Sequence, residues 1–197
     1  LTFYFFHKSW TRVVAMFGVL VLIISVAYQY NPVFKNRITK AENDIVKYES
    51  ELKGETKIKR GNSVGVRLHH TETTLRAFLN KPWLGYGTGS FEYAYRKQVE
   101  SDANYTLRPT NPHNHHALIL VQFGVLGFII YAAVYLTQLW QARVMPAAYD
   151  FRALALLLPL FYGLINLGET YMWGHQMQAL FAYMTAIIYR RDMWENA

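Results

Sequence analysis

The residue of this chain best suited to chemistry is a histidine that stands where a polar stretch meets an apolar one. His113 and Asn114 end the polar stretch, and nine residues later the apolar stretch contains Gly124-Val125-Leu126-Gly127. A titratable imidazole beside lipid is costly unless it has a role or a partner, and near neutral pH it can take up a proton. The pattern therefore favours proton-transfer chemistry at a membrane surface, with a purely structural histidine at a helix entry as the alternative.

Two arginines of the polar stretch, Arg67 and Arg76, are candidates for binding an anion. A guanidinium is permanently charged and can hold two phosphate oxygens at once. A solvated helix face is the usual place for an arginine, and the spacing of these two residues does not decide between the two interpretations.

The other histidines do not form a recognisable metal site. His115 and His116 adjoin His113, and His69 and His70 form a second group. Side chains at adjacent or alternate positions of a helix start cannot all point to one ion, and no nearby carboxylate completes a ligand set. The chain has no cysteine, which excludes a thiolate site, and we predict neither a metal nor another cofactor.

Apolar and charged residues are segregated along the 197 residues, of which 52% are hydrophobic. Apolar residues concentrate in 13–34 and 117–189, and charge concentrates in 35–108. Since about 20 apolar residues cross a bilayer, we predict an all-α, polytopic membrane protein with about four transmembrane helices. These helices are expected at 13–34, 117–142, 153–168 and 170–189.

The basic residues outside the polar stretch orient these helices. Lysine and arginine in short loops favour the cytoplasm, and four spans with a cytoplasmic N-terminus put all of them on that side: Lys8, Arg12, Arg143, Arg152, Arg190 and Arg191. The predicted organisation is a first transmembrane helix with a cytoplasmic lead (1–34), a large helical periplasmic loop (35–112) and three C-terminal transmembrane helices (113–197).

Two long helices are predicted within this loop. Apolar residues recur at three- and four-residue steps over 37–56, with charged residues that include Asp44 on the other face, so an amphipathic helix is expected there. The next helix is expected over 63–79, because Asn80-Lys81-Pro82 ends it.

Glycines mark two further features. Three glycines stand at alternate positions, which permits a tight turn: Gly85, Gly87 and Gly89. This turn is expected to lead into a helix over 90–100. Gly124 and Gly127 lie one helical turn apart, and we expect them to let another helix pack closely.

The formal net charge of +7 does not indicate nucleic-acid binding, because the basic residues are not gathered on one motif. Beside transmembrane helices, a lipid head group or a pyrophosphate is the more natural anionic partner.

Three motifs together resemble the signature region of the bacterial O-antigen ligase and polymerase superfamily. They are SVGVR at 63–67, NKPWLGYGTGSF at 80–91, and PHN at 112–114 followed after nine residues by GxxG. Members of this superfamily carry about a dozen spans, so the resemblance implies that the chain is the C-terminal part of a larger protein. It also implies a metal-independent glycosyltransferase of the bacterial inner membrane, with its active site on the periplasmic face.

The resemblance assigns expected roles to individual residues. His113 would deprotonate or orient the acceptor hydroxyl for attack on the anomeric carbon, and Arg67 would stabilise the departing pyrophosphate. A second pyrophosphate-binding arginine is expected, for which Arg37 is the first candidate and Arg76 the second. Asn114 is a further candidate for substrate binding.

The implied donor is a glycan on undecaprenyl pyrophosphate, and the first-choice acceptor is the lipid A-core. An O-antigen polymerase and a protein O-oligosaccharyltransferase are alternatives within the superfamily. Glu169 and His175 lie in the turn predicted between the last two spans, where a role in acceptor binding is open. A non-catalytic transport or partner-binding membrane protein is the alternative of another class, although the first two spans offer few polar groups for a conduction path.

Overall fold

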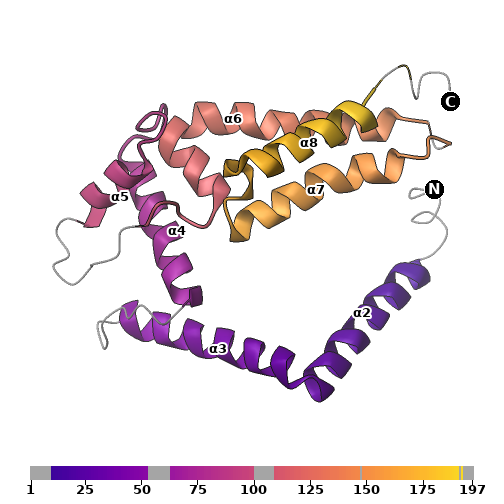
Figure 1. Cartoon of the computed structure of the whole chain (residues 1–197), viewed down its shortest axis with the longest axis horizontal. Helices are drawn as coiled ribbons and strands as arrows, with labels where there is room; N and C mark the ends of the chain where they lie inside the picture. Colours follow the sequence, from indigo (N-terminus) through magenta and orange to yellow (C-terminus); the bar gives the residue numbers. More distant parts are fainter. Residues whose placement is uncertain (1–9, 53–62, 100–108, 147, 191, 193–197) are drawn as a thin grey trace. The chain divides into compact units, whose positions relative to one another are not determined.

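The computed structural model describes residues 10–52, 63–99, 109–146, 148–190 and 192, and every regular element in these ranges is helical (Figure 1). The all-α prediction is therefore confirmed for this part of the chain. Among the described residues one helix, α6 (His115–Val144), is long and apolar enough to cross a membrane, and α7 (Arg152–Gly168) is a shorter apolar helix. The four spans and the periplasmic loop stay predictions.

The chain divides into two compact units, residues 1–66 and 67–197. In the first unit, α2 (Trp10–Tyr30) meets α3 (Pro32–Leu52) at Asn31. The Asn31 Oδ1 accepts a hydrogen bond from the Phe34 N–H at 3.1 Å. An asparagine cap followed by proline at the first helical position is a helix start. The helix α2 therefore ends at Tyr30, before the predicted end of the span at residue 34.

The helix predicted over 37–56 is part of α3, and its end beyond Leu52 lies outside the described residues. Tyr48 is buried, as its place on the apolar face predicts. Asp44 belongs to the charged face of the predicted amphipathic helix, yet this residue is only 4% exposed. Its Oδ2 accepts a hydrogen bond from the Val64 N–H at 3.4 Å, which satisfies one of the unpaired N–H groups at the start of the next helix.

The helices α4 (Ser63–Leu79) and α5 (Phe91–Val99) occur where the sequence predicts them. Residues of α4 and α5 pack on the first turns of α6 in a buried apolar cluster, which consists of Ala77, Phe91, Ala94, Tyr95, Leu118 and Val121. This packing brings the end of the polar stretch and the start of the long apolar helix together.

The glycine-rich turn between α4 and α5 is joined to α6 through the backbone. The Tyr86 N–H donates to the Val121 carbonyl at 2.9 Å, and the Val125 N–H donates to the Pro82 carbonyl at 2.7 Å. These bonds are possible because α6 is interrupted at Gly124, which has φ 66° and ψ −165°.

The predicted role of Gly124 in helix–helix packing is therefore wrong. A Cβ atom at Gly124 would overlap the backbone of Trp83, and a Cβ atom at Gly85 would overlap the backbone of Gln122. Both glycines also have positive φ, which only glycine adopts without strain. Gly124 thus makes room for the backbone of the glycine-rich turn and not for a second helix.

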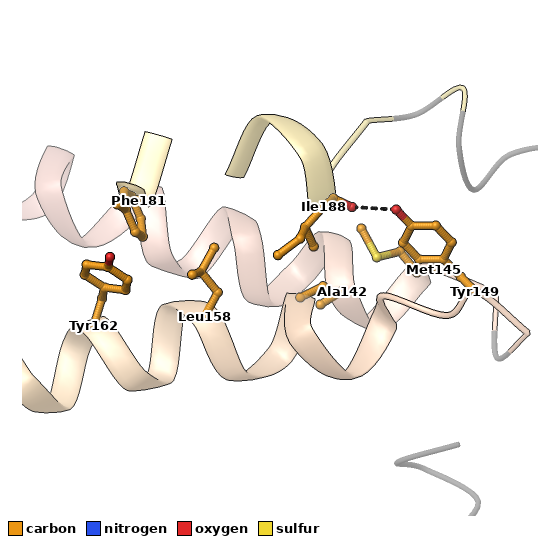
Figure 2. Packing of buried hydrophobic residues seen from close by; sticks show 8 residues of the cluster. Ala142, Met145, Tyr149, Leu158, Tyr162, Phe181 and Ile188 are labelled. Atoms are coloured by element: carbon orange, nitrogen blue, oxygen red, sulfur yellow. Dashed lines mark hydrogen bonds between the residues drawn. The ribbon is translucent and has the colours of Figure 1, made fainter. Parts of the chain in front are cut away.

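The remaining helices form a second apolar cluster, in which α7 and α8 (His175–Ile188) lie beside α6 (Figures 1 and 2). The buried residues of this cluster include Ala142, Met145, Tyr149, Leu158, Tyr162, Phe181 and Ile188. The Tyr149 hydroxyl donates to the Ile188 carbonyl at 3.0 Å. Pro159 lies inside α7 and cannot donate to the Ala155 carbonyl, and the Tyr189 hydroxyl donates to that carbonyl instead.

The last helix begins later than the predicted span 170–189. Residues Tyr171–Trp173 form the short helix η1, and α8 starts at His175. The Met172 N–H donates to the Asn166 Oδ1 at 3.3 Å, which ties η1 to the end of α7. This connection leaves Glu169 and Thr170 at the same end of α7 as the start of α6.

Candidate active site

The backbone around His113 is held in an uncommon conformation. His113 has φ 53°, in the left-handed region that non-glycine residues rarely adopt. Its N–H donates to the Asn111 Oδ1 at 2.9 Å, and the Thr71 hydroxyl donates to the neighbouring Pro112 carbonyl at 3.3 Å. Asn114 caps α6, since its Oδ1 accepts a hydrogen bond from the Ala117 N–H at 3.0 Å. Such strain persists only where surrounding contacts enforce it, and it is frequent at functional sites.

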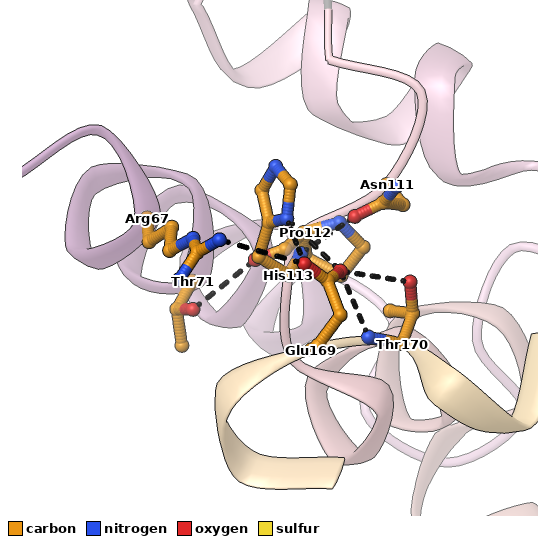
Figure 3. Close-up of polar contacts among 7 residues, drawn as sticks. All are labelled: Arg67, Thr71, Asn111, Pro112, His113, Glu169 and Thr170. Atoms are coloured by element: carbon orange, nitrogen blue, oxygen red, sulfur yellow. Dashed lines mark hydrogen bonds and ion pairs between the residues drawn. The ribbon is translucent and has the colours of Figure 1, made fainter. Parts of the chain in front are cut away.

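The side chain of His113, which lies just before α6, meets a carboxylate at the end of α7. Its Nδ1 lies 3.0 Å and 2.9 Å from the two carboxylate oxygens of Glu169, the residue that ends α7 (Figure 3). Arg67 on α4 reaches the same carboxylate, with its Nη2 3.7 Å from Oε2. Three elements far apart in the sequence therefore bring an imidazole, a carboxylate and a guanidinium together.

The environment of Glu169 keeps its carboxylate ionised. Burial by itself raises the pKa of Glu169, but the hydrogen bonds from His113 and from the Thr170 N–H, with the charges of His113 and Arg67, lower it overall. An ionised carboxylate at Nδ1 makes this nitrogen the donor, so Nε2 carries the free lone pair. Figure 3 shows the other ring nitrogen of His113 pointing away from Glu169. The His113 side chain is 31% exposed, so the pair is accessible.

A family model described as O-antigen ligase matches residues 1–132 of the 197. The chain belongs to the O-antigen ligase family. This membership indicates a membrane enzyme of the glycosyltransferase kind, which acts on glycan and lipid-linked substrates in lipopolysaccharide biosynthesis. Comparison with curated proteins gives no match.

Arg67 and His113 fall inside the region that matches the O-antigen ligase family, whereas Glu169 lies beyond it. The sequence suggests a role for Glu169 in acceptor binding, but it does not identify this residue as the partner of His113. The available signal was physical: a carboxylate between two apolar helices is costly unless it is paired, and His113 lies on the same predicted side of the membrane.

The other predicted site residues have different surroundings. Asn114 caps α6, as described above. Arg76 is exposed and pairs with Glu72 of its own helix at 2.5 Å. Arg37 is exposed on α3, in the unit 1–66. His175 is the exposed first residue of α8. Their roles in an enzyme of the O-antigen ligase family stay predictions.

Among the described ranges, no group of three or more histidines and carboxylates is placed to hold a metal ion. Instead, His113 and Arg67 both make their contacts with Glu169. This arrangement can do two things chemically: it can orient an imidazole for proton transfer, and it can present a cation to an anion that arrives beside it.

Proposed function

We propose that this chain carries the catalytic site of a metal-independent glycosyltransferase. The enzyme moves a glycan from undecaprenyl pyrophosphate to an acceptor hydroxyl, and the acceptor we propose is the lipid A-core. The observation that carries the proposal is the contact of His113 Nδ1 with both carboxylate oxygens of Glu169, beside Arg67. In this proposal the reaction takes place at the periplasmic face of the inner membrane.

The His113–Glu169 pair supplies the base. Glu169 accepts the proton of Nδ1 in a hydrogen bond, which selects the tautomer whose Nε2 is unprotonated and stabilises the imidazolium that forms. Nε2 takes the proton of the acceptor hydroxyl as its oxygen attacks the anomeric carbon. The new glycosidic bond forms while the bond from the anomeric carbon to the phosphate oxygen breaks.

Arg67 stabilises the leaving group. The pyrophosphate departs with the electron pair of the broken bond, and a guanidinium neutralises the charge that develops on its oxygens. The Arg67 side chain is 54% exposed, so it can turn from Glu169 to a phosphate without leaving a buried cavity. The 3.7 Å contact with Glu169 keeps the guanidinium beside the base when no donor is bound.

The direct test is complementation of a ligase-deficient bacterium that makes the matching donor. His113→Ala, Arg67→Ala and Glu169→Gln should each abolish or strongly reduce the glycan ladder on lipopolysaccharide, with lipid-linked donor accumulating in the membrane. Loss of the Glu169 charge is expected to lower transfer about 100-fold, the low end of the range for acid–base contributions. The product's acceptor, read by mass spectrometry, distinguishes lipid A-core ligation from glycan polymerisation and protein glycosylation.

Matched controls come from the same elements. Arg96→Ala removes an exposed arginine that is paired with Glu92 of α5 at 2.5 Å, and His69→Ala removes the histidine that precedes His70 on α4. Both variants should leave the ladder unchanged. Wild-type ladders in both His113→Ala and Arg67→Ala cells, at normal membrane levels of the protein, would refute the proposed site.

A further inference from the structure

A second imidazole lies against His113, and the reaction as proposed does not use it. His70 stands on α4, one helical turn after Arg67. Its ring is stacked on that of His113, with 5.9 Å between the ring centroids and 11° between the ring planes. Tyr95 of α5 meets His70 edge-on, at 5.6 Å and 88°. These values fall in the range of attractive aromatic contacts.

Hydrogen bonding does not explain the place of the ring at position 70. The residue is 4% exposed, and neither of its ring nitrogens has a hydrogen-bond partner among the residues that the structure describes. An imidazole buried without partners loses free energy that a phenylalanine or leucine in the same space would not lose. The polarity of this ring therefore adds no stability, and what the ring contributes is its flat shape and its contacts with the neighbouring rings.

His70 is neutral in the folded protein. Burial lowers the pKa of His70 to about 4, helped by the neighbouring rings of His113 and His69. The other groups around the two rings are Tyr95 on α5, Arg67 on α4 and Glu169 at the end of α7. A neutral ring next to His113 does not oppose the positive charge that His113 acquires when it accepts a proton.

We propose that His70 is a positioning residue, whose flat neutral ring holds the plane of the His113 ring so that Nδ1 meets Glu169 and Nε2 faces the acceptor. The contacts found for the His113 ring are this stack and the bonds to Glu169. Without the stack, the ring can turn about its Cβ–Cγ bond and break the bonds to the carboxylate. The inference rests on the proposed function of His113 as the base.

The kinetic test compares one variant that keeps a flat ring with two that do not. His70→Phe keeps the stack and should retain kcat within about threefold, whereas His70→Leu and His70→Met fill the space without a flat ring. The ringless variants should lower kcat about 10-fold or more with little change in KM, because small misplacements of a catalytic group are costly. His69→Ala is the matched control on α4 and should leave both constants unchanged.

A second readout does not depend on turnover. Nitrogen NMR of ¹⁵N-histidine-labelled full chain in nanodiscs reports which ring nitrogen of His113 carries the proton, with His113→Gln used to assign the signal. The wild type and His70→Phe should show the Nδ1-protonated tautomer alone, and the ringless variants should show a mixture. An inactive wild type with this pattern of tautomers would reject the proposed function and keep the positioning role.

Three results would overturn the inference. Wild-type kcat together with a single tautomer in a folded ringless variant would show that the stack is not needed. Equal impairment of His70→Phe and the ringless variants would show that the ring shape is not what matters. Loss of folding in both His70→Leu and His70→Met, measured by thermal unfolding, would make His70 a packing residue.

Discussion

Both ends of the unit 67–197 contain a buried apolar cluster, but they differ in how the segments around it are joined. At the end that carries the site, the glycine-rich turn is joined to α6 by backbone hydrogen bonds, and the helix is open at Gly124 to receive them. At the other end, α6, α7 and α8 meet through apolar side chains such as Leu158 and Ile188. Backbone hydrogen bonds have narrow geometry, whereas apolar packing tolerates adjustment. We therefore expect the end that carries the site to tolerate substitution less than the other end.

The largest effect should come from disrupting the backbone hydrogen bonds between the glycine-rich turn and α6. Gly124→Ala puts a Cβ atom into the backbone of Trp83 at a residue whose φ is 66°. We expect a loss of roughly 3 kcal/mol or more in the free energy of unfolding, since both strain and overlap oppose the change. Glycan transfer should be lost as well. Chemical unfolding in detergent and the lipopolysaccharide ladder measure the two effects.

Gly163→Ala is the control for this substitution. Gly163 lies in α7, and a Cβ atom there would meet no other atom within 4 Å. The exchange should be neutral or stabilise the helix by about 0.5–1 kcal/mol. If Gly124→Ala were as harmless as Gly163→Ala, the contrast between the two ends would be wrong.

A core substitution at the other end should separate stability from activity. Leu158→Ala removes a side chain that is 9% exposed in the α6–α7–α8 cluster. The expected loss is about 2–4 kcal/mol in the free energy of unfolding, while the rate of transfer per folded molecule stays at the wild-type value. A parallel fall in that rate would mean that the two ends are coupled more tightly than their contacts indicate.

The smallest effect on the free energy of unfolding is expected from lowering the pH. It should appear first at the end that carries the site. The pKa of His70 is about 4 in the folded protein against 6.5 for a free histidine, so the unfolded chain binds a proton that the folded chain does not. The stability that depends on neutral His70 is complete above pH 6.5 and is lost as the pH falls toward 4. At pH 5 the loss is about 2 kcal/mol by linkage.

Hydrogen exchange at pH 7 and pH 5 can locate this loss. Amides of α4 and α5 should exchange faster at the lower pH, while those of α7 and α8 change less. In His70→Phe the difference between the two pH values should shrink. An unchanged pH dependence in His70→Phe would assign the loss to another group.

The sequence predicts the helices around the site well because their ends carry strong local signals. Ser63 and Asn80-Lys81-Pro82 bracket α4, and Asn114 caps α6. The roles that the resemblance assigns to Arg67 and His113 require the two side chains to lie near one another, and both contact Glu169. The motif resemblance supplied this expectation, and periodicity alone would not have done so.

The features that were missed depend on contacts between distant residues. The pairing of His113 with Glu169 spans 56 positions, and no local pattern specifies which carboxylate meets which histidine. Gly124 fits a helix pattern, and its break is visible only when the Trp83 backbone lies against it. Asp44 follows the polar face of α3 in sequence, but the start of α4 buries it. Asn31-Pro32, by contrast, carries a local signal, because an asparagine cap before proline marks the boundary between α2 and α3.

The late position of Glu169 has a consequence for biogenesis. Because the carboxylate follows His113 by 56 residues, the ribosome must complete α7 before the imidazole gains its partner. A nascent chain that has inserted α6 already carries every residue that matches the family, yet it lacks the group that selects the histidine's tautomer. In the proposed mechanism, the catalytic base is therefore complete only when α7 has come to lie beside α6.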